Sequence, residues 1–193
     1  MKITVSTESI EDLNCESMIL GFFSDERPPK GYCGDVDWCF NGLISELIAR
    51  DGIQGRSMEK VLFQADHRLS VPKILLLGLG EKKSLDYRIL YHAGQVVLRT
   101  AHDIDCHNFA FDIPGAGRCG LDTAMMTESV LRGMNDFLPG DRTADREISA
   151  SILCRNTMIE AVCRGMENLR GMAETNFDII AGNGRSSAQD GTR

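Results

Sequence analysis

Two hydrophobic patterns alternate along the chain. Short, β-prone apolar runs predict strands. The run at 73–80 is almost entirely aliphatic, which indicates a central strand covered on both faces. Between the runs, apolar residues recur at helical spacing and predict amphipathic helices. The strands are expected at 2–7, 17–23, 60–65, 73–80, 107–113 and 147–153, and the helices at 36–50, 85–100, 126–138 and 159–169.

Local signals predict where several of these helices begin. The segment "ERPPKGYCGD" at 26–35 is rich in proline and glycine, and we expect it to be a connection that continues neither element. Ser84 is expected to cap the second helix, with Asp86 in its first turn. Thr157 and Glu160 have the spacing of a capping box ahead of the last helix.

Strands that alternate with helices predict an α/β protein, a three-layer α/β/α sandwich around one sheet. Because two strands follow each other at the start, we expect a mixed, mostly parallel sheet. Residues 1–180 are expected to form one domain. Residues 181–193 hold no apolar anchor and are expected to be a disordered C-terminal tail.

Composition and charge exclude several classes of function. The 193 residues are 42% apolar and 25% charged, and their formal net charge is −7. Such an acidic surface repels nucleic acid and anionic lipid, and no apolar run approaches the length of a membrane span. The seven cysteines lack a C-x-x-C pair, so we expect free thiols rather than disulfides or a zinc ribbon. These features predict a cytoplasmic protein that binds neither nucleic acid nor membrane.

Three segments carry a resemblance to a known family. In order, "DVDWCFNGLISELIARDGIQGR" at 35–56, "KILLLGLGEKKSLDYRILYHAGQVVLRTA" at 73–101 and "NFAFDIPG" at 108–115 resemble the N-terminal domain of the M17 leucyl aminopeptidases. A helix ending "RGMNDFL" at 132–138 follows in the same order. The segment 158–176 is similar to the helix that leads toward the family's catalytic domain. The resemblance implies a fold like that of macro domains.

The resemblance also implies a role without catalysis. In the family, two metal ions and an N-T-D-A-E-G-R-like segment belong to the C-terminal domain, and nothing in this sequence matches that segment. We therefore expect a non-catalytic accessory or oligomerisation domain with no cofactor. Its partner is expected to be a second copy of the chain or a separate M17-type catalytic chain. With a catalytic chain as the partner, this chain would be one subunit of a split metalloaminopeptidase.

The segment "FDIPGAGRCGL" at 111–121 is the main candidate for ligand binding. Macro domains wrap a diphosphate with a glycine-rich loop between a strand and a helix, and the matching positions here are Gly115, Ala116, Gly117, Arg118, Cys119 and Gly120. Glycines let backbone N–H groups approach an anion, so the resemblance implies ADP-ribose or another phosphorylated nucleotide as an alternative ligand. The other interpretations are a tight strand-to-helix corner and an unrecognised hydrolase that acts at the same loop. A Rossmann site is excluded because the loop follows several strands.

Other segments carry weaker chemical signals. The run "HDIDCH" at 102–107 groups potential zinc ligands, but a polar connection is the simpler interpretation. Cys119 lies near the start of an expected helix, where a thiol pKa falls, although no Cys/His/Asp order supports a nucleophile. The turn at 78–83 carries two lysines that could line the same site. Trp38, the only tryptophan, is expected in core or interface packing rather than ligand stacking.

Overall fold

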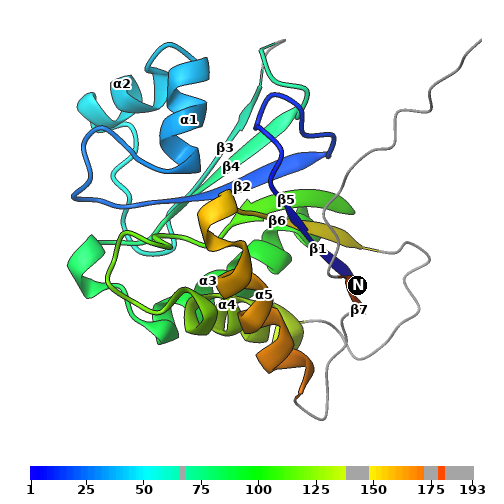
Figure 1. Ribbon diagram of the computed structural model, residues 1–193. Coiled ribbons are helices and arrows are strands. Elements are labelled where there is room, and N and C mark those ends of the chain that lie inside the picture. Colours follow the sequence, from blue (N-terminus) through cyan, green and yellow to red (C-terminus); the bar gives the residue numbers. More distant parts are fainter. Residues whose placement is uncertain (66–67, 138–147, 172–177, 181–193) are drawn as a thin grey trace, which may run out of the picture.

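A single seven-stranded sheet forms the centre of the molecule, with strand order β3-β4-β2-β5-β6-β1-β7 (Figure 1). The computed structural model describes residues 1–65, 68–137, 148–171 and 178–180. All adjacent strands are parallel except β3 and β4, which are antiparallel. The strands are β1 (Lys2–Ser6), β2 (Ser17–Phe22), β3 (Lys60–Gln64), β4 (Lys73–Gly78), β5 (Asn108–Asp112), β6 (Ser149–Leu153) and β7 (Asp178–Ile180).

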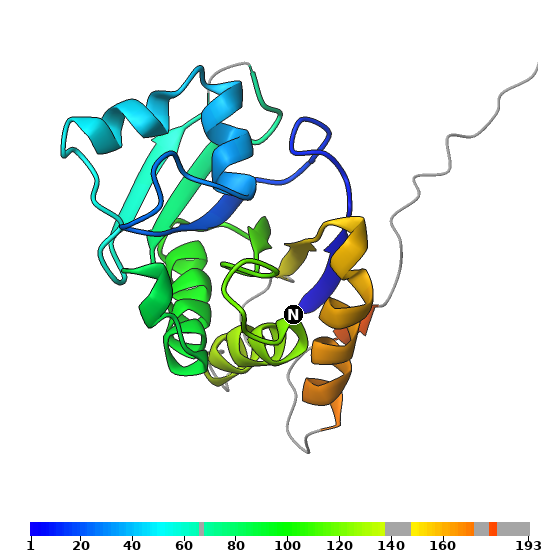
Figure 2. The same ribbon diagram turned by 60° about the vertical axis from the view of Figure 1, so that its left-hand side comes forward.

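Helices cover both faces of the sheet and make the three layers that the sequence predicts (Figures 1 and 2). The first two helices lie on one face, and the other three lie side by side on the opposite face. The helices are α1 (Tyr32–Cys39), α2 (Leu43–Ala49), α3 (Tyr87–Asp103), α4 (Thr123–Phe137) and α5 (Ile159–Arg170), with short 3-10 turns η1 (Lys82–Ser84) and η2 (Asn156–Met158).

The inner strands separate two hydrophobic cores. Because successive side chains of a strand point to opposite faces, Met18 and Leu20 of β2 pack toward α1 and α2, whereas Ile19 packs toward α3 and α4. Every residue of β2 is buried, and so are the last five of β4. The expectation that the aliphatic run of β4 is covered on both faces is therefore confirmed.

Two details of the first helical region differ from the prediction. The expected helix at 36–50 is two helices, and the first begins at Tyr32, inside the segment expected to be a connection. Asn41 and Gly42 adopt positive φ of 54° and 83°, which interrupts the helix. The apolar repeat continues across this break, so the pattern alone does not reveal it.

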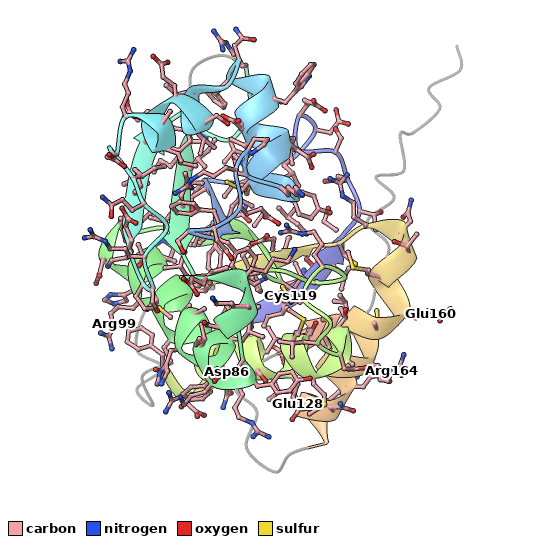
Figure 3. The ribbon with its side chains drawn as sticks, turned by 90° about the vertical axis from the view of Figure 1, so that its left-hand side faces the viewer. Asp86, Arg99, Cys119, Glu128, Glu160 and Arg164 are labelled. Carbon is pink, nitrogen blue, oxygen red and sulfur yellow. The ribbon has the colours of Figure 1, made fainter. Side chains whose placement is uncertain are left out.

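The predicted caps are wrong for α3 and α5. Asp86, not Ser84, caps α3, and its Oδ1 accepts a 2.7 Å hydrogen bond from the Ile89 N–H. Helix α5 begins after a 3-10 turn with no side-chain cap, and Glu160 lies exposed on its surface rather than in a capping box (Figure 3).

The sheet is mixed for a different reason from the one expected. The first two strands are not neighbours, since β1 pairs with β6 and β7, and the antiparallel pair is β3 with β4. The sequence pattern also missed β7. The expected end of the α4 helix at Leu138 and the expected tail at 181–193 lie outside the described residues.

Candidate functional site

A cavity of about 340 Å³ opens where β2, β5 and β6 end. Its wall is formed by the segments that follow these strands. The carboxyl ends of parallel strands are the usual place for a ligand site in α/β proteins. The lining residues include Gly31, Tyr32, Asp112, Gly115, Ala116, Gly117, Arg118, Arg155 and Met158.

The glycine loop between β5 and α4 forms one wall of this cavity. Gly115 is buried with φ of 76°, and a Cβ there would lie 2.4 Å from the Cys119 Sγ and 3.0 Å from Phe23. Only glycine fits this corner. Gly117 has φ of 69° and is exposed at the cavity. The loop is therefore a tight corner that also borders a cavity, so the two interpretations of the glycines do not exclude each other.

Several backbone N–H groups of this loop are not used within the described part of the protein, and two of them belong to residues that line the cavity, Gly115 and Gly117. The N–H groups of Ala116 and Arg118 are used in turns, donating to the Ile113 and Gly115 carbonyls. Within the described part of the chain, the N–H groups of Gly115, Gly117 and Cys119 make no hydrogen bond. An anion in the cavity could accept from amides of this kind.

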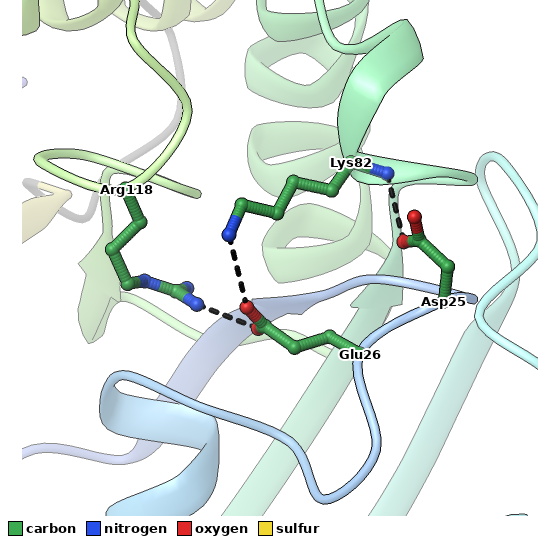
Figure 4. A network of polar contacts seen from close by, with 4 residues as sticks. All are labelled: Asp25, Glu26, Lys82 and Arg118. Carbon is green, nitrogen blue, oxygen red and sulfur yellow. Dashed lines mark hydrogen bonds and ion pairs between the residues drawn. The ribbon is translucent and has the colours of Figure 1, made fainter.

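Glu26 connects three loops at this edge of the sheet (Figure 4). Glu26 is buried, with 7% of its surface exposed. The Arg118 Nη1 of the glycine loop lies 2.6 Å from one carboxylate oxygen, and the Lys82 Nζ lies 3.5 Å from the other. The backbone N–H of Lys82 also donates to Asp25 at 2.9 Å. The positive charge of Arg118 is therefore already neutralised by a buried carboxylate of the protein itself.

Asp112, the last residue of β5, is a buried carboxyl group at the cavity wall. It is 7% exposed, and its Oδ1 accepts a 3.0 Å hydrogen bond from the Gly21 N–H of β2. Burial raises the pKa of Asp112 to about 6, although the Gly21 N–H and Arg118 act in the opposite direction. The group is mostly ionised at neutral pH and then opposes a bound anion.

The opposite wall comes from α1 and the segment after β6. Arg155 pairs with the Asp35 carboxylate, and its guanidinium lies 4.7 Å from the centre of the Tyr32 ring. Burial raises the pKa of the Tyr32 hydroxyl to about 12, so it remains a neutral donor. Both arginines of the cavity are thus paired with acids, and the site offers backbone amides and aromatic surface more than free positive charge.

The other sequence candidates do not assemble into a site. In the run 102–107, His102 and Asp103 are exposed, whereas Cys106 is buried with its Sγ 3.0 Å from the Ser17 Oγ. No group of three His, Cys, Asp or Glu residues that could hold a metal ion occurs among the described residues. Burial raises the pKa of Cys119, which argues against an activated thiolate there. Lys83 forms an exposed pair with Glu81, while Lys82 alone joins the site network.

Trp38 lies on the surface rather than in the core. This tryptophan, on α1, has 86% of its surface exposed. One groove beside it, of about 400 Å³, is lined partly by Glu8, Glu11 and Asp35, and another, of about 590 Å³, includes Pro28 and Pro29 among its lining residues. Of the two packing environments expected for this tryptophan, the core is excluded and an interface remains.

The model of the cytosol aminopeptidase family's N-terminal domain matches residues 19–135, more than half of the chain. The chain belongs to this family. A probable cytosol aminopeptidase from Alkaliphilus oremlandii is 23% identical over 133 residues, which cover 69% of this chain and 26% of that protein. The chain thus spans about a quarter of the length of that relative, and the resemblance to the M17 N-terminal domain is confirmed.

Solved structures show the same fold. Tomato leucine aminopeptidase, as the K354E mutant, has a TM-score of 0.58 at 17% identity, covering 87% of this chain and 36% of that one. The Trypanosoma brucei macrodomain, crystallised in complex with ADP, has a TM-score of 0.67 at 14% identity, covering 85% and 68%. The chain therefore has a macro-domain-like α/β fold, as the resemblance implies. In the part that the structure describes, no helix is long and apolar enough to cross a membrane.

Sequence reasoning found the glycine loop but missed most of the residues that surround it. Asp112 and Arg155 line the cavity, and Glu26 pairs with Arg118 beside it. These residues are far apart in the sequence, and only the sheet order brings them together. One signal was available for Asp112, because it ends an otherwise apolar strand directly before the glycine corner. Nothing local in the sequence marks Glu26 as the partner of Arg118, which is 92 residues away.

Proposed function

We propose that this chain is a non-catalytic accessory module of the cytosol aminopeptidase family that acts in the cytoplasm by association. The observation that carries the proposal is the exposure of Trp38 between two grooves. A tryptophan left in water loses the free energy of burying a large apolar surface, and tryptophan is among the residues that dominate protein interfaces. The partner we propose is an M17-type catalytic chain, because residues 19–135 match the N-terminal domain of the cytosol aminopeptidase family.

The Trp38 surface has the features of such an interface. The tryptophan lies on a short helix that is held in the core by Val36 on its inner side and by Phe40 directly after its end. Asp37 holds the start of α2 by accepting from the Ser45 N–H at 2.9 Å and the Ser45 hydroxyl at 2.5 Å. The surface is therefore rigid before binding, which lowers the entropy cost of association.

Replacing Trp38 with alanine should weaken binding to the catalytic chain about 30-fold or more, since hot-spot tryptophans cost about 2 kcal/mol or more. The measurement is light scattering and calorimetry on this chain mixed with an M17-type catalytic chain from the same genome. Met125→Ala is the matched control, because Met125 is 49% exposed on α4 at the other face of the sheet. Equal binding by the wild type and Trp38→Ala would show that this surface is not the interface.

We propose a second function for the cavity at the glycine loop, namely binding of ADP-ribose or another phosphorylated nucleotide. The unused N–H groups of Gly115 and Gly117, which line the cavity, support it, together with the N-terminal turn of α1 at Gly31. The pairing of Arg118 with Glu26 and the carboxyl group of Asp112 weigh against strong affinity. This function ranks second because the cavity lacks an unpaired cation among its described lining residues.

Thermal-shift measurements with ADP-ribose and with inorganic phosphate test this second function. A ligand at about ten times its Kd stabilises the folded state by about 1.4 kcal/mol, which raises the Tm by about 3–5 °C for a chain of this size. Ala116→Asp should abolish the shift because it adds a carboxylate at the loop, whereas Met125→Asp should leave it intact. No shift at millimolar ligand would remove the function.

A further inference from the structure

The strand β3 lies at the outer edge of the sheet with one side open. It pairs with β4, and no other strand lies beside it among the described residues. Its side chains alternate, with Lys60, Leu62 and Gln64 exposed and Val61 and Phe63 half-buried. The Phe63 ring packs edge-on against Phe40, which directly follows α1, at 5.8 Å, and this contact anchors the strand to the core.

The hydrogen-bond register shows which backbone groups point outward. The Ala65 N–H donates to the Pro72 carbonyl, and residues 65 and 72 lie opposite in the continued β3–β4 register. In an antiparallel ladder, hydrogen-bonded and non-hydrogen-bonded pairs alternate. Phe63 and Val61 therefore bond to β4, whereas the N–H and C=O groups of Lys60, Leu62 and Gln64 point away from the sheet.

The outward groups and the exposed side chains belong to the same residues. The three outward residues make no further hydrogen bond within the described chain. Leu62, at their centre, is 48% exposed and is one of three large apolar residues that are exposed in the described part of the chain. The strand thus offers a short ladder of donors and acceptors with an apolar residue in the middle.

We propose that β3 pairs with β3 of a second copy of this chain, antiparallel, about a two-fold axis at Leu62. The pairing goes beyond the proposed association with a catalytic chain, because it joins two copies of this chain through a different surface. In this register Leu62 faces Leu62, and Lys60 faces Gln64 at both ends. Each hydrogen-bonded pair exchanges two bonds, so the three pairs form about six. Two seven-stranded sheets become one continuous sheet.

Charge and ladder length select this register. A shift by two residues along the partner leaves only two outward pairs, and a shift that centres the axis on Lys60 places two lysines opposite each other. Lysine on an edge strand commonly blocks unwanted pairing. Lys60 therefore disfavours the arrangement centred on itself, the shorter ladder disfavours the two-residue shifts, and the Leu62-centred register keeps three pairs without like charges.

A bulge limits the ladder at one end. The Met58 N–H donates to the Gly78 carbonyl and the Gly78 N–H donates to the Glu59 carbonyl, so two residues oppose one, and Met58 has φ of 62°. The bulge turns the chain away from the edge before Lys60. The pairing is therefore confined to the five residues of β3, and we expect a reversible dimer of modest affinity.

Sedimentation velocity on the full chain, from about 1 µM to about 1 mM, tests the proposal. We expect a monomer–dimer equilibrium whose Kd rises tenfold or more in Leu62→Lys, which opposes two charges at the axis. Leu62→Pro removes an N–H that the chain's own sheet does not use, and it should also abolish the dimer. Met125→Lys is the control and should dimerise like the wild type.

Hydrogen exchange identifies the surface independently of any substitution. The amides of residues 60, 62 and 64 should become protected as the protein concentration rises, whereas those of the Trp38 surface should not. A monomer at every concentration, or a dimer that Leu62→Lys and Leu62→Pro leave unchanged, overturns the β3 pairing. Neither result affects the proposed association with a catalytic chain, which the Trp38→Ala experiment tests in a mixture.

Discussion

Replacing Gly133 with alanine is expected to lower the free energy of unfolding by about 2–4 kcal/mol. A Cβ at Gly133 would lie 1.9 Å from the Tyr91 carbonyl oxygen of α3. On the facing helix, a Cβ at Gly94 would lie 2.0 Å from the Val130 carbonyl oxygen of α4. These neighbours are backbone atoms, so a methyl group fits only if the two helices move apart. Separation of the helices would disrupt the core around Leu90, Val97 and Met134.

Urea denaturation followed by circular dichroism measures this loss. The control is Gly171→Ala at the end of α5, where the nearest atom to a new Cβ is 3.6 Å away and φ is −70°. That substitution should change the free energy of unfolding by no more than about 0.5 kcal/mol. If Gly133→Ala is as stable as Gly171→Ala, then the close approach of α3 and α4 does not contribute as the structure implies.

The local hydrophobic pattern predicted the strands and helices better than it predicted which strands lie side by side in the sheet. Six of the strands and the main helices follow from apolar runs and helical repeats, because each such pattern lies within one segment. Strand neighbours depend on pairing between distant segments. Thr4 of β1 bonds through its hydroxyl to Ser151, 147 residues away, and no local feature of residues 2–6 predicts that β6 rather than β2 is the partner.

Helix ends were predicted less well because several residues compete for one role. Ser84 and Asp86 can both cap a helix, and the chain uses Asp86 because the 3-10 turn at 82–84 places Ser84 before the helix. At 40–42, the left-handed conformation of Asn41 and Gly42 breaks a helix whose apolar repeat continues. The first difference arises from local backbone conformation, whereas the second had a local signal, because an Asn-Gly pair is typical of turns.

The sequence predicted only one wall of the candidate site, the glycine loop. The glycines mark a corner from the sequence alone, because positive φ favours glycine. The electrostatic character of the cavity could not be predicted, since it depends on Glu26 neutralising Arg118 and on Asp35 pairing with Arg155. Sequence reasoning assigned Arg118 to a ligand, whereas the structure places it first in an ion pair within the protein.

Asp112→Asn should stabilise the protein at neutral pH by about 2–3 kcal/mol and have little effect near pH 4. Burial raises the pKa of Asp112 to about 6, above the value of about 3.9 in the unfolded chain. Between these values the folded state binds a proton that the unfolded state has released. Stability from this group is therefore present below about pH 4 and is lost as the pH rises through about 6. Asparagine keeps an oxygen for the Gly21 N–H and carries no charge to desolvate.

Urea unfolding of the wild type and Asp112→Asn at several values between about pH 4 and pH 8 measures the difference. Asp103→Asn, which makes the same change at an exposed position at the end of α3, is the matched control. A difference between wild type and Asp112→Asn that stays constant with pH would contradict the buried, proton-binding carboxyl group. The same variant removes the negative charge at the cavity wall, so any nucleotide that binds there should bind Asp112→Asn more tightly at pH 7.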